Sequence, residues 1–126
     1  MNAVLMGKVQ AVKYLLRKGA DVTIPEKDGY TPIHGAGFQG RAEIAKLLIN
    51  HGVPINDEHT DGYRPIHRAC WGQEERHTDT VRVFLEGGAK LRGDELKATQ
   101  NDRTKQLLIK WQERQQASHA EQSDGL

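Results

Sequence analysis

Residues 28–36 read DGYTPIHGA, and residues 61–69 read DGYRPIHRA. Seven of the nine positions are identical, and the two stretches lie 33 residues apart. The similarity extends beyond them, because GKVQAVKYLLRKGADV at 7–22 is an earlier version of GRAEIAKLLINHGVPI at 40–55. A pattern that recurs at this period predicts structural units that stack, since one such unit cannot bury its own apolar face.

Two further copies follow. The third, HTDTVRVFLEGGAKL at 77–91, matches the second at a spacing of 36, because three extra residues lie within 72–76. We expect these residues to enlarge the loop between the two helices of that unit, where added length costs little stability. A weaker fourth copy, GDELKATQNDRTKQLLIKW, occupies 93–111.

The second copy combines a turn with two short helices. The Asp-Gly pair at 28–29 marks a tight turn. Thr31 and Pro32 predict the start of the first helix, because a Thr hydroxyl can accept a bond from a free backbone N–H and Pro tolerates the first helical position. Apolar residues then recur at intervals of three and four in AEIAKLLIN at 42–50, which predicts an amphipathic second helix.

The stretch DGYTPIHGAGFQGRAEIAKLLINHGVPIN resembles the ankyrin repeat. It has the Asp-Gly turn, a Thr-Pro-x-His helix start, a glycine between the helices, and a second helix with paired aliphatic residues before another glycine. The resemblance covers residues 1–91 well and 92–116 loosely. It implies an all-α ankyrin-repeat solenoid of stacked helix–turn–helix units with turn or hairpin tips, built from three to four repeats with atypical first and last units.

The domain boundaries follow from this pattern. We expect an ankyrin repeat domain at 1–116, with repeats at about 1–25, 26–58, 59–94 and 95–116. Asp94 and either Asn101 or Asp102 are the N-cap candidates of the last unit. Leu107, Leu108 and Trp111 form a helical stripe that could close the stack. Residues 117–126 are polar, and we expect them to be disordered.

Composition narrows the class of protein. The formal net charge is +1, from 18 basic and 17 acidic residues, which does not fit a nucleic-acid-binding surface. A single cysteine, Cys70, excludes an internal disulfide and fits a reducing compartment. The chain contains no apolar run long enough for a membrane span and no signal-peptide pattern. We therefore expect a cytoplasmic protein, with the nucleus as the alternative location.

Histidines and the cysteine are the candidates for chemistry. His34 and His67 occupy equivalent repeat positions, and in ankyrin proteins this histidine bonds the turn within its own unit, so we interpret both as structural. Cys70 follows His67 by three residues, and a Cys–His nucleophile pair is the rival interpretation. Because no third orienting group is evident, we expect a buried, inert thiol. We predict no catalytic residue, no cofactor and no metal site.

Aromatic residues carry the prediction of a binding surface. Tyr30 and Tyr63 follow the two turns, while Phe38 and Trp71 end the first helices of their units. The ankyrin resemblance implies that these places line the concave groove and turn tips, where partners dock. In the alternative interpretation, the tyrosines only pack over the turns and Phe38 touches Trp71. The polar rim of the predicted site consists of Lys27, Asp28, Gln39, Thr60, Asp61 and Gln73.

Two local features qualify this interpretation. Arg64 stands where the previous repeat has Thr31, so an N-cap hydroxyl is lost and the third unit is expected to be looser. A basic stripe in the first repeat predicts either a solvated helix face or contact with an acidic partner segment. This stripe consists of Lys8, Lys13, Arg17 and Lys18.

Taken together, these patterns predict a non-catalytic scaffold module that binds another protein through its groove and turn tips. We expect it to be a monomer on its own. The alternative is an ankyrin regulatory or docking segment of a larger multidomain enzyme or channel.

Overall fold

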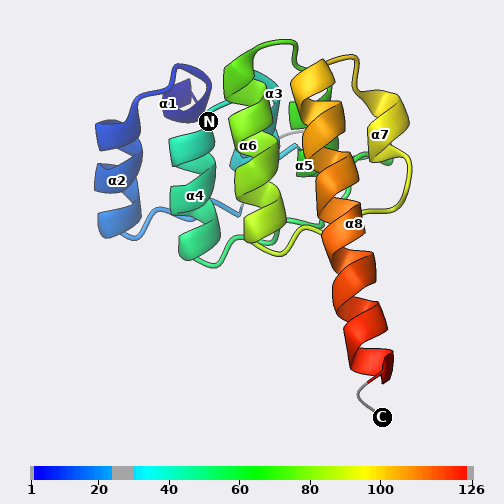
Figure 1. The fold of residues 1–126 in the computed structure, drawn as a ribbon. Helices are drawn as coiled ribbons and strands as arrows, with labels where there is room; N and C mark the ends of the chain where they lie inside the picture. The colour runs from blue at the N-terminus through cyan, green and yellow to red at the C-terminus, as the bar shows by residue number, and fades with distance from the viewer. Residues whose placement is uncertain (1, 24–29, 125–126) are drawn as a thin grey trace.

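The computed structural model describes residues 2–23 and 30–124, and within these ranges the regular structure is helical throughout. Figure 1 shows α2, α4, α6 and α8 side by side in chain order, with α8 extending below the others. The helices are α1 (Asn2–Leu5), α2 (Val9–Arg17), α3 (Pro32–Gln39), α4 (Ala42–Asn50), α5 (Pro65–Cys70), α6 (Glu75–Glu86), α7 (Glu95–Ala98) and α8 (Asp102–Asp124).

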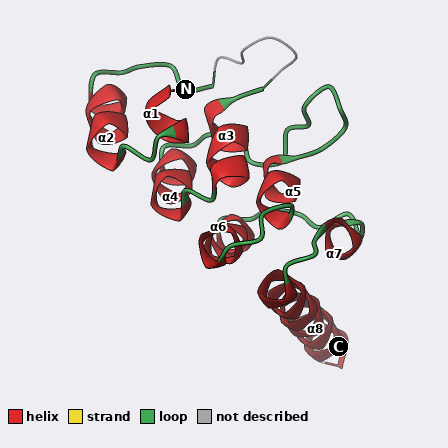
Figure 2. Ribbon diagram, turned by 90° about the horizontal axis from the view of Figure 1, so that it is seen from above, coloured by secondary structure: helices red, strands yellow, loops and turns green. Residues whose placement is uncertain are grey.

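The helices form two rows. Seen from above, α2, α4, α6 and α8 make one row, and the shorter α1, α3, α5 and α7 make the other (Figure 2). Contacts along each row join α3 to α5 and α4 to α6, while contacts between rows join the two helices of each unit. This is the stacked helix–turn–helix solenoid that the sequence predicts, so the all-α fold class is confirmed.

Local sequence sets where the helices begin and end. Thr31 has an extended backbone at φ −111° and ψ 166°, and Pro32 then begins α3. Gly40 ends this helix in the left-handed conformation at φ 68°, which a glycine adopts without steric cost. The chain can therefore reverse in two residues before α4 begins.

The core lies between the rows and repeats from unit to unit. Ile33 and Ile66, the residues after the two helix-starting prolines, are each 1% exposed. Leu48 and Phe84 occupy equivalent positions in the second helices of their units, and both are fully buried. Neither helix of a unit is long enough to be stable in isolation, so this shared burial holds the stack together.

The three extra residues of the third unit lengthen a helix, although we expect them to enlarge a loop. Helix α6 has 12 residues, whereas α4 has 9. The insertion therefore adds a first turn to α6, and it places the buried His77 in that turn. Glu75 lies in the same turn, where a carboxylate interacts favourably with the helix dipole.

The fourth unit closes the stack with α7 and α8. Asn101 caps α8, since its Oδ1 accepts the N–H of Arg103 at 3.1 Å. Its Nδ2 donates to the carbonyls of Gly72 and Glu74, which fixes the last unit to the third. Leu108 is fully buried, and Leu107 and Trp111 pack against the core as the helical stripe predicts.

Helix α8 continues past residue 116, the expected end of the repeat domain, and ends at Asp124. The expected disorder of the polar tail stays a prediction. Gln, Glu and Arg make up QERQQ at 112–116, and these residues favour helix propagation. Side chains from Glu113 to Ala117 are exposed, so the helix leaves the stack near this point. The repeat boundaries themselves stay a prediction.

No helix among the described residues is both long enough and apolar enough to span a bilayer.

Candidate protein-binding surface

Three histidines hold the starts of three helices. In each case the histidine lies three residues after the residue that precedes the helix, and its Nδ1 accepts the backbone N–H of that preceding residue. His34 does this for Thr31 at 3.3 Å, His67 for Arg64 at 3.1 Å, and His77 for Glu74 at 3.3 Å. The arrangement resembles half of a capping box, with an imidazole in place of the usual Glu or Gln.

The opposite ring nitrogens connect distant parts of the chain. Because Nδ1 accepts, Nε2 carries the proton and donates. His34 donates to the carbonyl of Asp57 at 3.2 Å, and His77 donates to the carbonyl of Phe38 at 3.1 Å. His67 donates to Oδ1 of Asp94 at 2.8 Å. The structural interpretation of His34 and His67 therefore agrees with the geometry.

Thr31 and Arg64 precede equivalent helices but make different side-chain contacts. The Thr31 hydroxyl lies 2.8 Å from Nδ1 of His34. Arg64 has no hydroxyl for the equivalent contact with His67. Its Nη1 instead donates to the carbonyl of Lys90 at 3.1 Å. The expectation that the third unit is looser stays a prediction.

His67 and Cys70 lack the features of a nucleophile and its base. Both side chains are fully buried, and both nitrogens of the His67 ring are bonded to other residues. Burial, with smaller contributions from Glu95 and Asp94, raises the pKa of Cys70 to about 12. The sulfur is therefore a thiol at neutral pH, whereas the thiolate is the reactive form.

Arg68 brings together four of the ten predicted binding residues. Its guanidinium carbon lies 4.9 Å from the ring centroid of Trp71 and 5.6 Å from that of Tyr30. Trp71 in turn meets the ring of Tyr63 edge-on, with 5.1 Å between centroids. We name the Arg68 cluster after this residue, and its members are Tyr30, Asp61, Tyr63, Arg68 and Trp71.

The charge of Arg68 is neutralised inside the cluster. Arg68 is only 8% exposed, and its Nη2 donates to Oδ2 of Asp61 at 2.6 Å and lies 2.6 Å from Nδ1 of His59. Burial acts to raise the pKa of Asp61, but the N–H of Tyr63 and the guanidinium of Arg68 outweigh it and lower that pKa. Asp61 is thus ionised at neutral pH, and the pair fixes the turn against α5.

The tyrosines and Phe38 differ in their surroundings. Tyr30 is half-buried against the rings of His34 and His59, at centroid distances of 5.7 and 5.5 Å. Tyr63 is 37% exposed beside Trp71, and Phe38 is 51% exposed at the end of α3. Both tyrosine rings pack against histidine rings of their own chain, as the alternative interpretation expects, and whether they also contact a partner stays a prediction. That interpretation is not met for Phe38, whose ring takes part in none of the aromatic contacts found among the described residues.

The predicted polar rim is only partly defined. Lys27 and Asp28 lie outside the described residues. Thr60 and Gln73 are exposed, Gln39 is half-buried, and Gln73 donates a long bond of 3.4 Å to the carbonyl of Trp71. Among the rim residues that the structure describes, Asp61 is therefore the one joined to the aromatic rings, through its bond to Arg68.

Arg92, which the sequence motifs do not include, supports the cluster from the end of the third unit. Its Nη1 donates to the carbonyl of Gly62 at 2.8 Å and pairs with Glu58 at 3.2 Å. Its guanidinium lies 6.0 Å from the ring centroid of Tyr63. The sequence signal for it is its position near the end of the third repeat, from which it reaches back across 30 residues.

One group of side chains has the spacing of metal ligands. Atoms of His67, Asp94 and Glu95 lie within 4.8 Å of one another. The Arg92 guanidinium already supplies positive charge there, at 2.7 Å from Asp94 and 3.3 Å from His67. Hydrogen bonds from Arg92 and then His67 lower the pKa of Asp94 well below its usual range. Asp94 therefore already pairs with Arg92 and His67. Glu95 accepts the backbone N–H groups of Arg92 and Gly93.

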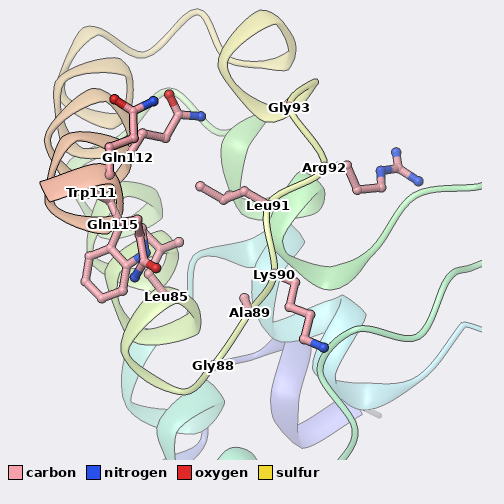
Figure 3. Close-up of a pocket in the computed structure, with 11 residues that line it drawn as sticks. Leu85, Gly88, Ala89, Lys90, Leu91, Arg92, Gly93, Trp111, Gln112 and Gln115 are labelled. Atoms are coloured by element: carbon pink, nitrogen blue, oxygen red, sulfur yellow. The ribbon is translucent and has the colours of Figure 1, made fainter. Parts of the chain in front are cut away.

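A cavity of about 730 Å³ opens between α8 and the loop after α6 (Figure 3). Trp111 and Gln112 reach it from α8, and Leu91 reaches it from the loop, whereas Arg92 points away from α8. None of the predicted binding residues lines it. The cavity therefore forms a separate feature at the fourth unit.

Comparisons with known proteins agree with the architecture. A family model described as ankyrin repeats, in three copies, matches residues 1–94. No curated protein matches the sequence. Among solved structures, the crystal structure of the human ASB11 ankyrin repeat domain is 29% identical, with a TM-score of 0.65, over 71% of this chain and 39% of that one. The chain thus spans about two fifths of that solved domain. With the family model covering three quarters of its length, the chain belongs to the ankyrin repeat family.

Proposed function

We propose that this protein is a non-catalytic module that binds a partner protein through the Arg68 cluster. Ankyrin repeats are generally protein–protein interaction modules, which sets the class of function. The observation that carries the proposal is the fixed geometry of Tyr63 and Trp71. Both rings retain accessible surface, yet each is held by neighbours within its own chain.

Pre-organisation explains why this arrangement suits binding. Immobilising a free side chain at an interface costs about 0.5–1.5 kcal/mol, and a ring that is already held avoids most of that cost. Tyr, Trp and Arg are also the residues most enriched among interface hot spots. Phe38 adds a further exposed ring on the preceding unit, and the rim of Lys27, Asp28, Gln39, Thr60, Asp61 and Gln73 is proposed to surround the contact. An interface of standard size would bury about 800 Å² on this side.

A catalytic role has less support. The buried thiol of Cys70 has a pKa of about 12, and both ring nitrogens of His67 are engaged. Neither group can therefore supply a thiolate or a free base at neutral pH without a rearrangement of the core. This favours a binding module over a cysteine-dependent enzyme.

The experiment identifies a partner by affinity capture on the full chain and then measures its Kd with purified protein. We expect Tyr63→Ala combined with Trp71→Ala to weaken binding by at least about 2 kcal/mol, which is roughly 30-fold in Kd. Circular dichroism should show that the helices remain. Tyr14→Ala is the matched control, because it removes a 54% exposed aromatic ring from the far end of the stack. Unchanged affinity in the double variant would overturn the proposal.

A further inference from the structure

A cleft of about 360 Å³ lies between α2 and α4, in the row of second helices (Figure 2). It is internal to the stack, because one helix from each of the first two units forms a wall. Leu16 and Leu47, both half-buried, make up its apolar part. The polar and basic side chains that line it are Gln10, Lys13, Arg17, Asn50 and His51.

Positive charge is concentrated in this cleft. Lys13 and Arg17 are four residues apart on α2, so they are neighbours on one face of the helix, and like charges at this spacing are unfavourable. The helix dipole favours a positive charge at Arg17, which lies in the last turn of α2, but Lys13 lies further from that end. The described residues that line the cleft include no Asp or Glu.

Ion pairing differs between this cleft and the rest of the chain. Among the described residues, neither Lys13 nor Arg17 takes part in an ion pair. The arginines that do so are Arg64, Arg68, Arg76, Arg82, Arg92 and Arg103. The two charges of the cleft are therefore available to carboxylates from another molecule.

The equivalent cleft one unit later, between α4 and α6, provides an internal comparison. It has aliphatic residues at the same places, but its volume is about 150 Å³. Lys46 occupies the repeat position of Lys13, whereas Asn50 stands at that of Arg17, and Glu86 supplies a negative charge. Basic and acidic side chains therefore balance there, whereas basic ones alone line the cleft between α2 and α4. Stacking of the units does not require this excess of positive charge.

We propose that the cleft between α2 and α4 binds an acidic segment of a partner protein. Carboxylates of that segment pair with Lys13 and Arg17, and charge-assisted bonds of this kind are the stronger hydrogen bonds. An aliphatic side chain of the segment covers Leu16 and Leu47. The formal net charge of the chain is only +1, which favours an acidic protein segment over a nucleic acid.

The probes are two fluorescein-labelled peptides of about 12 residues, a length at which isolated helices are not stable. One repeats Glu-Glu-Leu and the other repeats Gln-Gln-Leu, so they differ in charge but hardly in shape. Fluorescence anisotropy gives the Kd of each peptide for the full chain. We expect the Glu peptide to bind about fivefold more tightly, because two surface ion pairs are formed and each contributes modestly. Added salt should reduce this difference by screening.

Variants assign the binding to the cleft. Lys13→Gln combined with Arg17→Gln should lower the affinity for the Glu peptide about fivefold, to the level of the Gln peptide. Lys8→Gln combined with Lys18→Gln is the matched control, because it removes the same charge from residues that do not line the cleft. The control should bind the Glu peptide nearly as wild type does. Circular dichroism should stay unchanged, since Gln has a helix propensity close to that of Lys and Arg.

Three outcomes would overturn the proposal. The first is equal binding of the two peptides. The second is an equal loss in the two double variants, which would show that net charge and not the cleft attracts the peptide. The third is a labelled single-stranded DNA that binds more tightly than the Glu peptide and loses binding in Lys13→Gln/Arg17→Gln, which would assign the cleft to nucleic acid.

The cleft is distinct from the Arg68 cluster, which lies on α5 and on the turns before the first helices (Figure 2). Tyr63→Ala combined with Trp71→Ala should therefore leave the Kd of the Glu peptide unchanged. The two proposals can thus fail independently.

Discussion

At the scale of single residues, an imidazole at the third helical position does two tasks at once in this protein. Its Nδ1 holds the start of its own helix, and its Nε2 ties that helix to a group 23 to 39 residues away. In a usual capping box, the Glu or Gln side chain holds only the start of its own helix. The recurrence of histidine in the repeat is therefore explained by backbone hydrogen bonding and not by chemistry on a substrate.

The first prediction concerns pH. Burial, followed by the charge of Arg68, lowers the pKa of His34 to about 4, below the value of about 6.5 in an unfolded chain. Between these values the unfolded chain binds a proton that the folded chain does not, so the free energy of unfolding falls as pH falls from about 6.5 towards 4. Urea unfolding of wild type and His34→Gln should show a steeper loss in wild type, by about 1 kcal/mol per pH unit. Parallel pH profiles for the two proteins would contradict this account.

The second prediction concerns Gly72. A Cβ placed on this residue would overlap the His77 ring, which reaches past it to the carbonyl of Phe38. Gly72→Ala should lower the free energy of unfolding by about 1–3 kcal/mol, as expected for overpacking. In a His77→Ala background the same substitution should cost much less, because the ring is gone. A double-mutant cycle from denaturant unfolding measures this, and additive losses would show that the two residues do not conflict.

At the scale of secondary-structure elements, identical repeat positions have different surroundings along the stack. Helices α2, α4 and α6 present equivalent residues, yet only α4 and α6 have a helix before them in their row (Figure 2). Helix α6 also gains a turn that α4 lacks, which brings His77 and Glu75 into the fold. The contribution of a residue to stability therefore depends on its unit as well as on its place in the repeat.

The third prediction tests this dependence. Leu48→Ala removes a fully buried side chain, and we expect it to cost about 2–5 kcal/mol, the range for large-to-small changes in cores. Leu15→Ala changes the equivalent residue, which is 43% exposed, and should cost less than about 1 kcal/mol. Thermal or urea unfolding of the two variants compares them directly. Similar losses would mean that α2 is covered in the free protein.

At the scale of the whole molecule, the repeat period was sufficient to predict the stacked helical architecture. Pro32, Pro65 and the paired aliphatic residues act locally, so their consequences could be derived from the sequence. The sequence predicts a longer loop from the three-residue insertion, because spacing alone does not show whether extra residues lengthen a helix. Arg68 and Arg92 do not follow from the sequence for a related reason. Their partners Asp61, Gly62 and Glu58 are 7 to 34 residues away and become neighbours only in the folded chain.

Of the predicted binding residues, the structure groups Tyr30, Asp61, Tyr63 and Trp71 around Arg68 and leaves Phe38 apart. Sequence reasoning could identify equivalent aromatic positions, because these recur with the repeat. It could not show which rings touch, because that depends on the rotation between units and on the pairing of the buried Arg68 with Asp61. Partner contact by these residues stays a prediction.

The central claim is that a partner docks on the Arg68 cluster, and backbone hydrogen exchange of the full chain with and without a captured partner tests it most directly. We predict slower exchange on binding in residues 59–64 and 67–73, which carry Asp61, Tyr63, Arg68 and Trp71. Slower exchange confined to α2, α4 or α6, with these two segments unchanged, would contradict the account.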